Sequence, residues 1–430
     1  MNADKIILGE GAIFSSDSNI TGLNNNVIVC GTSGCGKTVS IAEPRILETF
    51  NSSLIVTVTK RRLAQKYKSL FEERGYIVKD MNFADPSESN VTYDPLKYIK
   101  TFSDITFLAE SVVRSNPRKE KNTTADPYWD EAAISLLSAE IAYVLGTKTK
   151  PTFSDVLELH DSIEYEECSG SIKTNLDGKF KMFGIKGHKL SNFAMSCWKS
   201  FQRLPLKTAS CIFGTLNTTI DTLFSPELRE MIKKNESVDF EALASKKTVL
   251  FIATSAVNPT LNCFINMFYA QAFKKLFEFA EAQPDGKLPI PVHLLADDFA
   301  TGSPILLFPD YISIFREKML SVTLLIQSES QLERMYGPDA TTIINNADTY
   351  VYMGGMDLLT CRHISERANV PLEDVLTMPV GKMYIFRRGQ KAIFTERYNV
   401  TESPLYQCVT QEYEDGILRK NKERHLMTDR

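Results

Sequence analysis

The strongest chemical signal in the sequence is a glycine-rich turn, which follows the apolar run 27–30 and precedes helix-forming residues. The turn consists of Gly31, Thr32, Ser33, Gly34, Cys35, Gly36, Lys37 and Thr38. This is the spacing of a phosphate-binding loop, in which glycines let successive backbone N–H groups face one anion. We expect Lys37 to reach the terminal phosphates of ATP and the Thr38 hydroxyl to hold Mg²⁺. The structural alternative is a strand-to-helix turn without a ligand.

A second chemical signal is a pair of acids directly after the apolar run 291–296. A phosphate-binding loop of this kind needs an acid at the end of a neighbouring strand to complete the Mg²⁺ shell. We expect Asp297 to serve the metal and Asp298 to polarise the attacking water. An Asp-Asp turn without a ligand is the alternative.

Two further polar residues lie near another apolar run, 322–326. Gln327 ends that run, where its amide can sense the terminal phosphate and orient water; a simple strand-end cap is the alternative. Arg316 lies between the acids and Gln327 and is a candidate arginine finger for a neighbouring subunit's nucleotide. Such a finger contributes roughly 10³–10⁵-fold in rate where it occurs. A solvated arginine on a helix is the alternative.

The elements that position these residues form an alternating pattern of strands and helices. Short apolar runs rich in β-branched residues predict strands at 27–30, 54–58, 76–78, 248–253, 291–296, 322–326 and 350–353. Strands separated by helices indicate a parallel α/β sheet. Residues 382–387 and 391–396 predict a closing hairpin, and Pro44 is expected to kink the helix after the glycine-rich turn.

The pattern becomes mainly helical between about residues 105 and 235. We therefore predict a first part of a nucleotide-binding domain over 1–104, an inserted all-α domain over 105–235 and a second part over 236–410. Residues 167–190 are polar and contain several Gly and Lys residues, which is typical of a mobile loop. The charged segment 411–430 is expected to be a flexible tail.

Composition is that of an ordinary globular protein of 430 residues, with 43% hydrophobic and 24% charged residues, and its length suggests at least two domains. A net charge of −4 argues against a protein that coats nucleic acid through bulk charge. The eight cysteines form no C-x-x-C pair, and thiols in a reducing cytosol are expected. The uncharged run 248–273 is long enough for a membrane span, but Asn258 and Pro259 interrupt it.

Several motifs together give the sequence a family resemblance. They are GTSGCGKT at 31–38, YDPL at 93–96, DPYW at 126–129, LLADDFATGSPI at 294–305, IQSESQLERMYG at 326–337, IINNAD at 343–348 and MGG at 353–355. In this order they resemble the conjugative coupling proteins of type IV secretion, the TraG/TraD-type ATPases. The resemblance runs from about residue 25 to residue 400.

The resemblance implies a RecA-like fold with an inserted all-α domain that recruits substrate. It implies a homo-oligomeric, hexameric ATPase ring that draws DNA, usually single-stranded and bound to a relaxase, towards a secretion channel. Carried over by position, residues 31–38 bind nucleotide, Asp297 serves Mg²⁺, Asp298 is the catalytic acid, Gln327 the sensor and Arg316 the finger in trans. A motor of this type contacts the DNA backbone and needs no sequence specificity.

Three features depart from the family pattern. Family members usually carry an N-terminal membrane anchor, whereas this chain starts directly at the ATPase, so we expect a cytoplasmic protein that reaches the inner face of the membrane through a partner. The second acid of the pair is usually Glu and here is Asp298, which leaves the hydrolysis rate open. The strand after the glycine-rich turn and its helix tends to end in Asp-Pro-Lys and here reads Val58-Thr59-Lys60.

Two alternatives to a DNA-translocating coupling protein stay open. One is a receptor or adaptor that binds ATP, hydrolyses it slowly and recruits a secreted protein through residues 105–235. The other is a soluble ring translocase of the HerA/FtsK kind. The basic turn 60–62 is a weak candidate for a DNA-contacting pore loop, and a solvated basic turn is the alternative.

Overall fold

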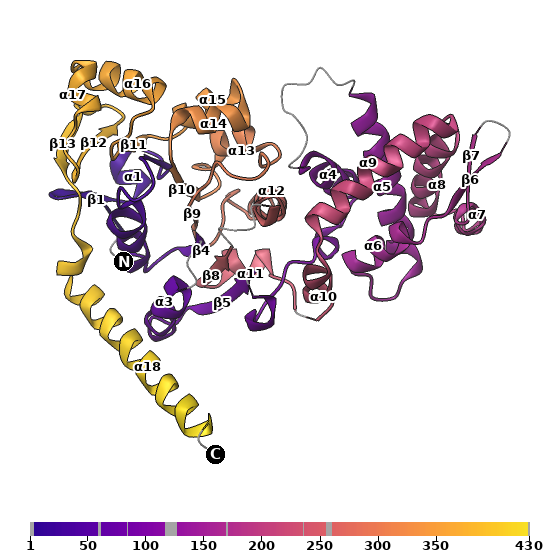
Figure 1. Cartoon of the computed structure of the whole chain (residues 1–430), viewed down its shortest axis with the longest axis horizontal. Helices are drawn as coiled ribbons and strands as arrows, with labels where there is room; N and C mark the ends of the chain where they lie inside the picture. Colours follow the sequence, from indigo (N-terminus) through magenta and orange to yellow (C-terminus); the bar gives the residue numbers. More distant parts are fainter. Residues whose placement is uncertain are drawn as a thin grey trace.

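The computed structural model describes residues 4–58, 62–83, 85–116, 127–168, 171–234, 236–254 and 260–428. Figure 1 shows a body built round a central sheet and a second, mainly helical part beside it, which is formed by the middle of the chain. A hairpin of β1 (Lys5–Gly9) and β2 (Ala12–Ser15) precedes the central sheet.

The central sheet has nine strands within the described residues, in the order β13-β12-β11-β3-β10-β9-β4-β8-β5. The strands are β3 (Val27–Cys30), β4 (Ser53–Val58), β5 (Ile77–Asn82), β8 (Thr248–Ala253), β9 (Val292–Ala296), β10 (Leu320–Ile326), β11 (Thr349–Tyr352), β12 (Lys382–Arg387) and β13 (Ile393–Glu396). All pairs from β11 to β5 are parallel, and β12 and β13 add an antiparallel edge. This confirms the predicted α/β class and its mainly parallel sheet.

The strands are apolar because both faces of the sheet are covered. In β3, Val27 and Val29 belong to one buried cluster, whereas Ile28 and Cys30 belong to another on the opposite face. The first cluster includes residues of α2 (Glu43–Leu47), α3 (Arg62–Glu73) and α18 (Pro404–Thr428). The second includes α12 (Thr260–Glu281), α13 (Phe308–Ile314), α14 (Glu329–Tyr336), α15 (Asp339–Asn345), α16 (Leu358–Ala368) and α17 (Leu372–Leu376). Two-sided burial explains why these strands are almost continuously hydrophobic.

The helical part contains α4 (Phe102–Arg114), α5 (Tyr128–Thr147), α6 (Phe153–Asp161), α7 (Asp177–Ile185), α8 (Lys189–Gln202), α9 (Leu206–Leu223) and α10 (Pro226–Lys234). The chain enters and leaves this part side by side. The Thr92 N–H donates to the Glu236 carbonyl at 2.9 Å, and the Val238 N–H donates to the Thr92 carbonyl at 2.8 Å. An insertion with adjacent ends fits between two neighbouring elements without disturbing the sheet. α11 (Phe240–Ser245) then leads back to β8.

The segment 167–190 is more ordered than its composition suggested. It contributes to a hairpin of β6 (Tyr165–Cys168) and β7 (Ser171–Thr174) and then forms α7. Trp198 fixes this region, since its ring stacks on Phe180 at 3.9 Å and its Nε1–H donates to Asp177 at 3.0 Å. The polar composition of the segment gave no indication that Phe180 would be anchored by Trp198, a contact that only tertiary packing reveals.

One other expectation needs correction. The predicted tail 411–430 is helical as far as Thr428 and belongs to α18. The start of α18 contacts α3, where Nζ of Lys66 lies 3.5 Å from the ring centre of Tyr406. Figure 1 shows the far end of α18 projecting from the body. Pro44 lies in the first turn of α2, directly after the π-helical segment 38–42, so the helix after the glycine-rich turn is irregular just before this residue. The kink at Pro44 stays a prediction.

In the part of the chain that the structure describes, no helix combines the length and the apolar character needed to cross a membrane.

Candidate nucleotide site

The glycine-rich turn is fixed by two strands that lie on either side of β3. The Gly31 N–H donates to the Ile326 carbonyl at 3.1 Å, and the Thr32 N–H donates to the Gly354 carbonyl at 3.0 Å. Gly34 and Gly36 have φ values of 79° and 92°, a backbone region that L side chains rarely adopt. The turn therefore curls back on itself at the carboxyl end of the sheet.

Lys37 lies over the turn that precedes it. Its side chain is largely buried, and Nζ donates to the carbonyls of Gly31 at 2.5 Å and Thr32 at 3.1 Å. A phosphate held in the turn would offer charged oxygens, which form stronger hydrogen bonds with an ammonium group than neutral carbonyls do. The position of this cation fits the role predicted for it.

The two acids meet the turn from the neighbouring strand end. The Thr38 hydroxyl donates to Oδ2 of Asp297 at 3.1 Å. Asp298 follows with a φ of 51°, and the Gln327 side-chain amide donates to its Oδ1 at 3.4 Å. Because β3, β10 and β9 are neighbours in this order, their carboxyl ends bring Lys37, Thr38, Asp297, Asp298 and Gln327 together, as is usual for ligand sites of open α/β sheets.

The electrostatics of the acid pair favour a cation. Burial raises the pKa of Asp297, the nearby Asp298 carboxylate raises it further, and the Thr38 hydroxyl and Lys37 offset only part of this. Mg²⁺ between the pair and a phosphate would relieve both effects. In the described residues no cluster of three His, Cys, Asp or Glu side chains could hold a metal by itself. A hydroxyl and one carboxylate nevertheless fit Mg²⁺, because this ion usually takes its remaining ligands from phosphates and water.

One functional candidate that the sequence analysis missed is Arg397, at the end of the antiparallel edge of the sheet. Its guanidinium donates to the Cys35 carbonyl, and a Cβ added to Gly36 would lie 2.6 Å from Nη1. The turn is thus held from outside by a second positive charge. Arg397 lies more than three hundred residues along the chain from the turn and follows a strand in no recognisable motif, so only the folded sheet reveals it.

A second missed group supports the turn that carries Gln327. The buried carboxylate of Glu329 accepts a hydrogen bond from Arg367 at 2.9 Å and contacts His363. Its backbone N–H donates to the Thr360 hydroxyl at 2.9 Å. These contacts fix the first residue of α14, two positions after Gln327, and therefore the direction in which β10 ends.

Arg316 does not share this site. It is exposed in the turn before β10, at the amino end of a strand whose carboxyl end carries Gln327. A strand of seven residues spans roughly 20 Å, so Arg316 cannot reach the nucleotide turn of its own chain. Its action on a neighbouring subunit stays a prediction. Of the basic turn 60–62, only Arg62 lies within the described residues, at the start of α3.

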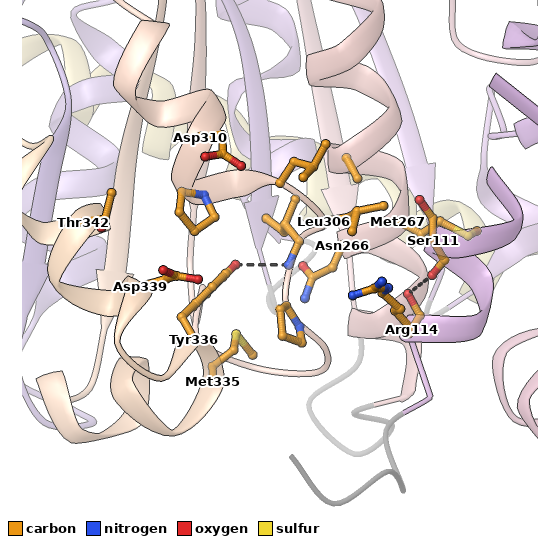
Figure 2. A pocket seen from close by; sticks show the side chains of 16 residues that line it. Ser111, Arg114, Asn266, Met267, Leu306, Asp310, Met335, Tyr336, Asp339 and Thr342 are labelled. Atoms are coloured by element: carbon orange, nitrogen blue, oxygen red, sulfur yellow. Dashed lines mark hydrogen bonds between the residues drawn. The ribbon is translucent and has the colours of Figure 1, made fainter. Parts of the chain in front are cut away.

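The loop after Asp298 connects the site with the helical part. Asn266 of α12 donates to the carbonyls of Thr301 at 3.0 Å and Ser303 at 2.5 Å, and the Ile305 N–H donates to the Tyr336 hydroxyl at 3.1 Å. Asn266, Ile305 and Tyr336 line a cavity of about 420 Å³. Figure 2 shows Tyr336 on one side of it and Arg114 of α4 on the other, with Asn266 between them. The loop that starts at the acids therefore ends at the junction with the insertion.

Comparison with known proteins agrees with this architecture. A model of the type IV secretory system conjugative DNA transfer family matches residues 3–368. The plasmid coupling protein TrwB in complex with ADP and Mg²⁺ has a TM-score of 0.66 at 16% identity, over 93% of this chain and 90% of that chain. TrwB in complex with the non-hydrolysable ATP analogue ADPNP has a TM-score of 0.56 at 16% identity, over 87% and 85% of the two chains.

VirB4 of Thermoanaerobacter pseudethanolicus has a TM-score of 0.54 at 11% identity, over 95% of this chain and 98% of that chain. At such identities these likenesses concern the fold. None of the curated proteins compared with the chain matches it. The family match covers most of the sequence, including the glycine-rich turn, the acid pair and Gln327. The chain belongs to the type IV secretory system conjugative DNA transfer family.

Proposed function

We propose that this protein is an ATP-hydrolysing motor that delivers single-stranded DNA or a nucleoprotein substrate to a type IV secretion channel. The observation that carries the proposal is the convergence of Lys37, Thr38, Asp297, Asp298 and Gln327 at three adjacent strand ends. The family match supports DNA transfer, and TrwB, a protein of similar fold, has been crystallised with ADP and Mg²⁺.

In the proposed reaction, backbone N–H groups of residues 31–38 and the Lys37 ammonium hold the β- and γ-phosphates of ATP. Thr38 and Asp297 would hold Mg²⁺, which would supply positive charge beside the phosphate oxygens. Asp298 accepts a proton from the attacking water while Gln327 orients that water. The new bond joins the water oxygen to the γ-phosphorus, and the bond to the β-phosphate oxygen breaks to release ADP and phosphate.

The motor is proposed to work as a homo-oligomeric ring, because Arg316 is separated from the nucleotide turn of its own chain by the length of β10.

 A finger that lies at the opposite edge of the sheet can serve only a nucleotide held by another copy of the chain, where it would stabilise the charge of the transition state. A hexamer is the ring that the family resemblance implies. The helical part is proposed to recruit the relaxase or another secreted protein, and a membrane partner to hold the ring at the inner face of the membrane.

One observation favours a second candidate, an ATP-binding receptor that hydrolyses slowly. The carboxylate of Asp298 is one methylene shorter than the Glu usual at this position, and its contact with Gln327, at 3.4 Å, is long for a hydrogen bond. A base that reaches water poorly would leave a protein that binds nucleotide and cargo without fast turnover.

The experiment that separates the two is steady-state ATP hydrolysis with and without single-stranded DNA. Wild type is compared with Lys37→Ala and with Lys391→Ala, a control that removes an exposed lysine from the edge hairpin. The motor predicts strong stimulation by DNA in wild type and in the control, and none in Lys37→Ala. Tight ATP binding with negligible turnover under every condition would refute the motor and support the receptor.

A further inference from the structure

A large pocket lies at the amino edge of the sheet, opposite the nucleotide turn. Its volume is about 820 Å³, and it is bounded by the turns that precede β4, β9 and β10 and by the lead-in hairpin. The side chains that matter here are Arg45, Lys287 and Arg316, together with Asp4, Asp17 and Glu317. No role in the proposed ATPase reaction requires this pocket apart from the finger predicted at Arg316.

Arg45 gives the pocket its unusual chemistry. The residue is only 6% exposed, and neither Nε nor Nη1 of its guanidinium has a hydrogen-bond partner. Burial lowers the pKa of Arg45, while Asp4 and Tyr76 act in the opposite direction without forming an ion pair with it. Burying guanidinium N–H donors without hydrogen-bond partners is costly, because these donors have lost water and gained no hydrogen bond in exchange.

Asp4, the acid whose charge acts on Arg45, is already engaged by neutral donors. Its carboxylate accepts hydrogen bonds from the backbone N–H groups of Phe50 and Asn51 at 3.1 Å each. It also accepts from the side chains of Asn51 at 3.1 Å and Ser52 at 3.0 Å. Asp4 therefore serves to tie the amino end of the chain to the start of β4.

The other charged residues of the pocket show the same difference between paired acids and unpaired cations. Asp17 caps α1 (Ser18–Thr21), and Glu317 pairs with Lys318 at 3.0 Å. Lys287 and Arg316 are exposed at the rim, and in the described part of the chain neither has a carboxylate within ion-pair distance. Every acid of the pocket has a partner, whereas its three cations have none.

We propose that this pocket binds a phosphate group, with Arg45 at its floor and Lys287 and Arg316 at its rim. A guanidinium with unused N–H donors forms strong, charge-assisted hydrogen bonds with phosphate oxygens, and three cations suit a dianion better than a carboxylate. The phosphate has two possible sources. It is either free phosphate or the terminal phosphate of a nucleotide held by an adjacent copy; the second source rests on the proposed ring.

The test uses the full chain with Lys37→Ala, which removes phosphate binding at the nucleotide turn. Binding of inorganic phosphate and pyrophosphate is measured by calorimetry at constant ionic strength. We expect binding to persist in Lys37→Ala and to weaken by about tenfold or more when Lys287→Ala and Arg316→Ala are added, since each removes a charge-assisted contact. Lys37→Ala with Lys391→Ala is the matched control and should bind as Lys37→Ala does.

Arg45→Met gives a second and independent readout. The variant is made in the Lys37→Ala chain, which is the parent here. We expect it to lose phosphate binding. In phosphate-free buffer it should melt at the same temperature as the parent or higher, because an unpaired buried charge is gone. Added phosphate should raise the melting temperature of the parent but not that of Arg45→Met. Equal phosphate binding in the parent, the rim variants and Arg45→Met would overturn the proposal, as would no binding at all.

The two possible sources of the phosphate are distinguished by measuring self-association of wild type and of Arg45→Met with Lys37 intact. If the phosphate belongs to a neighbour's nucleotide, ADPNP promotes association of wild type in sedimentation experiments but not of Arg45→Met, although both bind ADPNP at the nucleotide turn. If it is free phosphate, ADPNP promotes association equally in both, and in the Lys37→Ala background only the chain that keeps Arg45 binds phosphate. The calorimetric experiment measures phosphate binding in a Lys37→Ala chain, which cannot hydrolyse ATP. Its result can therefore be interpreted even if the proposed motor function is wrong.

Discussion

The backbone at Asp298 accounts for one departure from the family pattern. Its φ of 51° lies in the left-handed region, which Asp and Asn enter more readily than longer side chains do. A Glu at this position would gain reach but would fit this backbone less well. The short acid is therefore consistent with the local geometry. Its efficiency as a general base depends on how close the attacking water lies to its carboxylate.

Asp298→Asn tests the assigned proton acceptor without straining this backbone, because Asn tolerates the same region. We expect kcat for ATP hydrolysis to fall by about 10²–10⁴-fold, the usual contribution of a general base. Nucleotide affinity, measured by calorimetry, should stay within a few-fold of wild type. Glu317→Gln, which removes an exposed acid at the far edge of the sheet, serves as control. A kcat within twofold of wild type would assign the base to another residue.

A buried ion pair in the helical part predicts a dependence of stability on pH. Nδ1 of His160 lies 3.0 Å from Glu140, and both side chains are fully buried. Burial lowers the pKa of His160, but the Glu140 carboxylate outweighs it and leaves the pKa raised. A raised folded-state pKa stabilises the protein fully below the unfolded pKa of about 6.5, and this contribution disappears as pH rises through the folded value.

We therefore expect the free energy of unfolding to decrease as the pH rises from 6 towards 9, and to decrease less in His160→Gln. Urea denaturation at several pH values measures both slopes. His188→Gln, which changes an exposed histidine, should keep the wild-type slope. The interpretation fails if His160→Gln and wild type have the same pH dependence.

At the residue scale, site residues that belong to a local sequence motif could be predicted from the sequence. Lys37, Thr38, Asp297, Asp298 and Gln327 each follow a recognisable strand, and the structure brings them together. Arg397, Glu329 and Arg45 were not predicted, because their importance depends on which distant segment they contact. A single sequence contains no signal for such contacts.

At the scale of elements, strands were predicted well because burial on both faces makes them continuously apolar. The order of strands was not predictable, since β3 pairs with β10 and β11 from the far end of the chain. The hairpin and helix within 165–185 were missed because short polar elements depend on anchors such as Trp198. The helix α18 was missed because its charged sequence resembles a solvated tail.

Gly302, in the loop after the acid pair, offers a test at this scale. Its φ is 80°, and an added Cβ would lie 2.9 Å from backbone atoms of Asn262 and Cys263 at the start of α12. Because backbone cannot move aside as a side chain can, we expect Gly302→Ala to destabilise the protein by about 2–4 kcal/mol, the sum of strain and crowding. The same displacement should lower kcat, since the loop begins at Asp298.

Gly286→Ala is the matched control, because Gly286 has a φ of 70° but open space around an added Cβ. It should show the backbone strain alone, about 1 kcal/mol, and leave kcat unchanged. Thermal and urea unfolding of both variants measure the difference. Equal destabilisation by the two substitutions would show that the close approach at Gly302 has no energetic effect.

At the scale of the whole molecule, one hydrophobic cluster extends from the sheet into the helical part. Phe224, directly after α9, packs edge-on against Phe264 of α12 with ring centres 5.5 Å apart, and the ring centre of Tyr93 lies 5.4 Å from that of Phe264. Lys275 of α12 also pairs with the buried Asp104 of α4 at 2.9 Å. The helical part is therefore expected to unfold together with the sheet rather than as a separate domain.

Both tryptophans of the chain, Trp129 and Trp198, belong to the helical part, so tryptophan fluorescence reports on that part alone. We expect its thermal transition to coincide with that of far-ultraviolet circular dichroism. ADP with Mg²⁺, which binds at the sheet, should raise both midpoints equally. In Lys37→Ala neither midpoint should respond. A fluorescence transition that ignores the nucleotide would mean that the insertion folds independently.

The position of β3 has a consequence for how the protein is made. This strand lies at residues 27–30, and its two neighbours in the sheet lie at 320–326 and 349–352. At about 5–20 residues per second, a ribosome needs roughly 15–60 s to proceed from the first of these strands to the second. Until then the turn at 31–38 lacks the Ile326 and Gly354 carbonyls that hold it. Nucleotide can therefore assist folding only once nearly the whole chain has been synthesised.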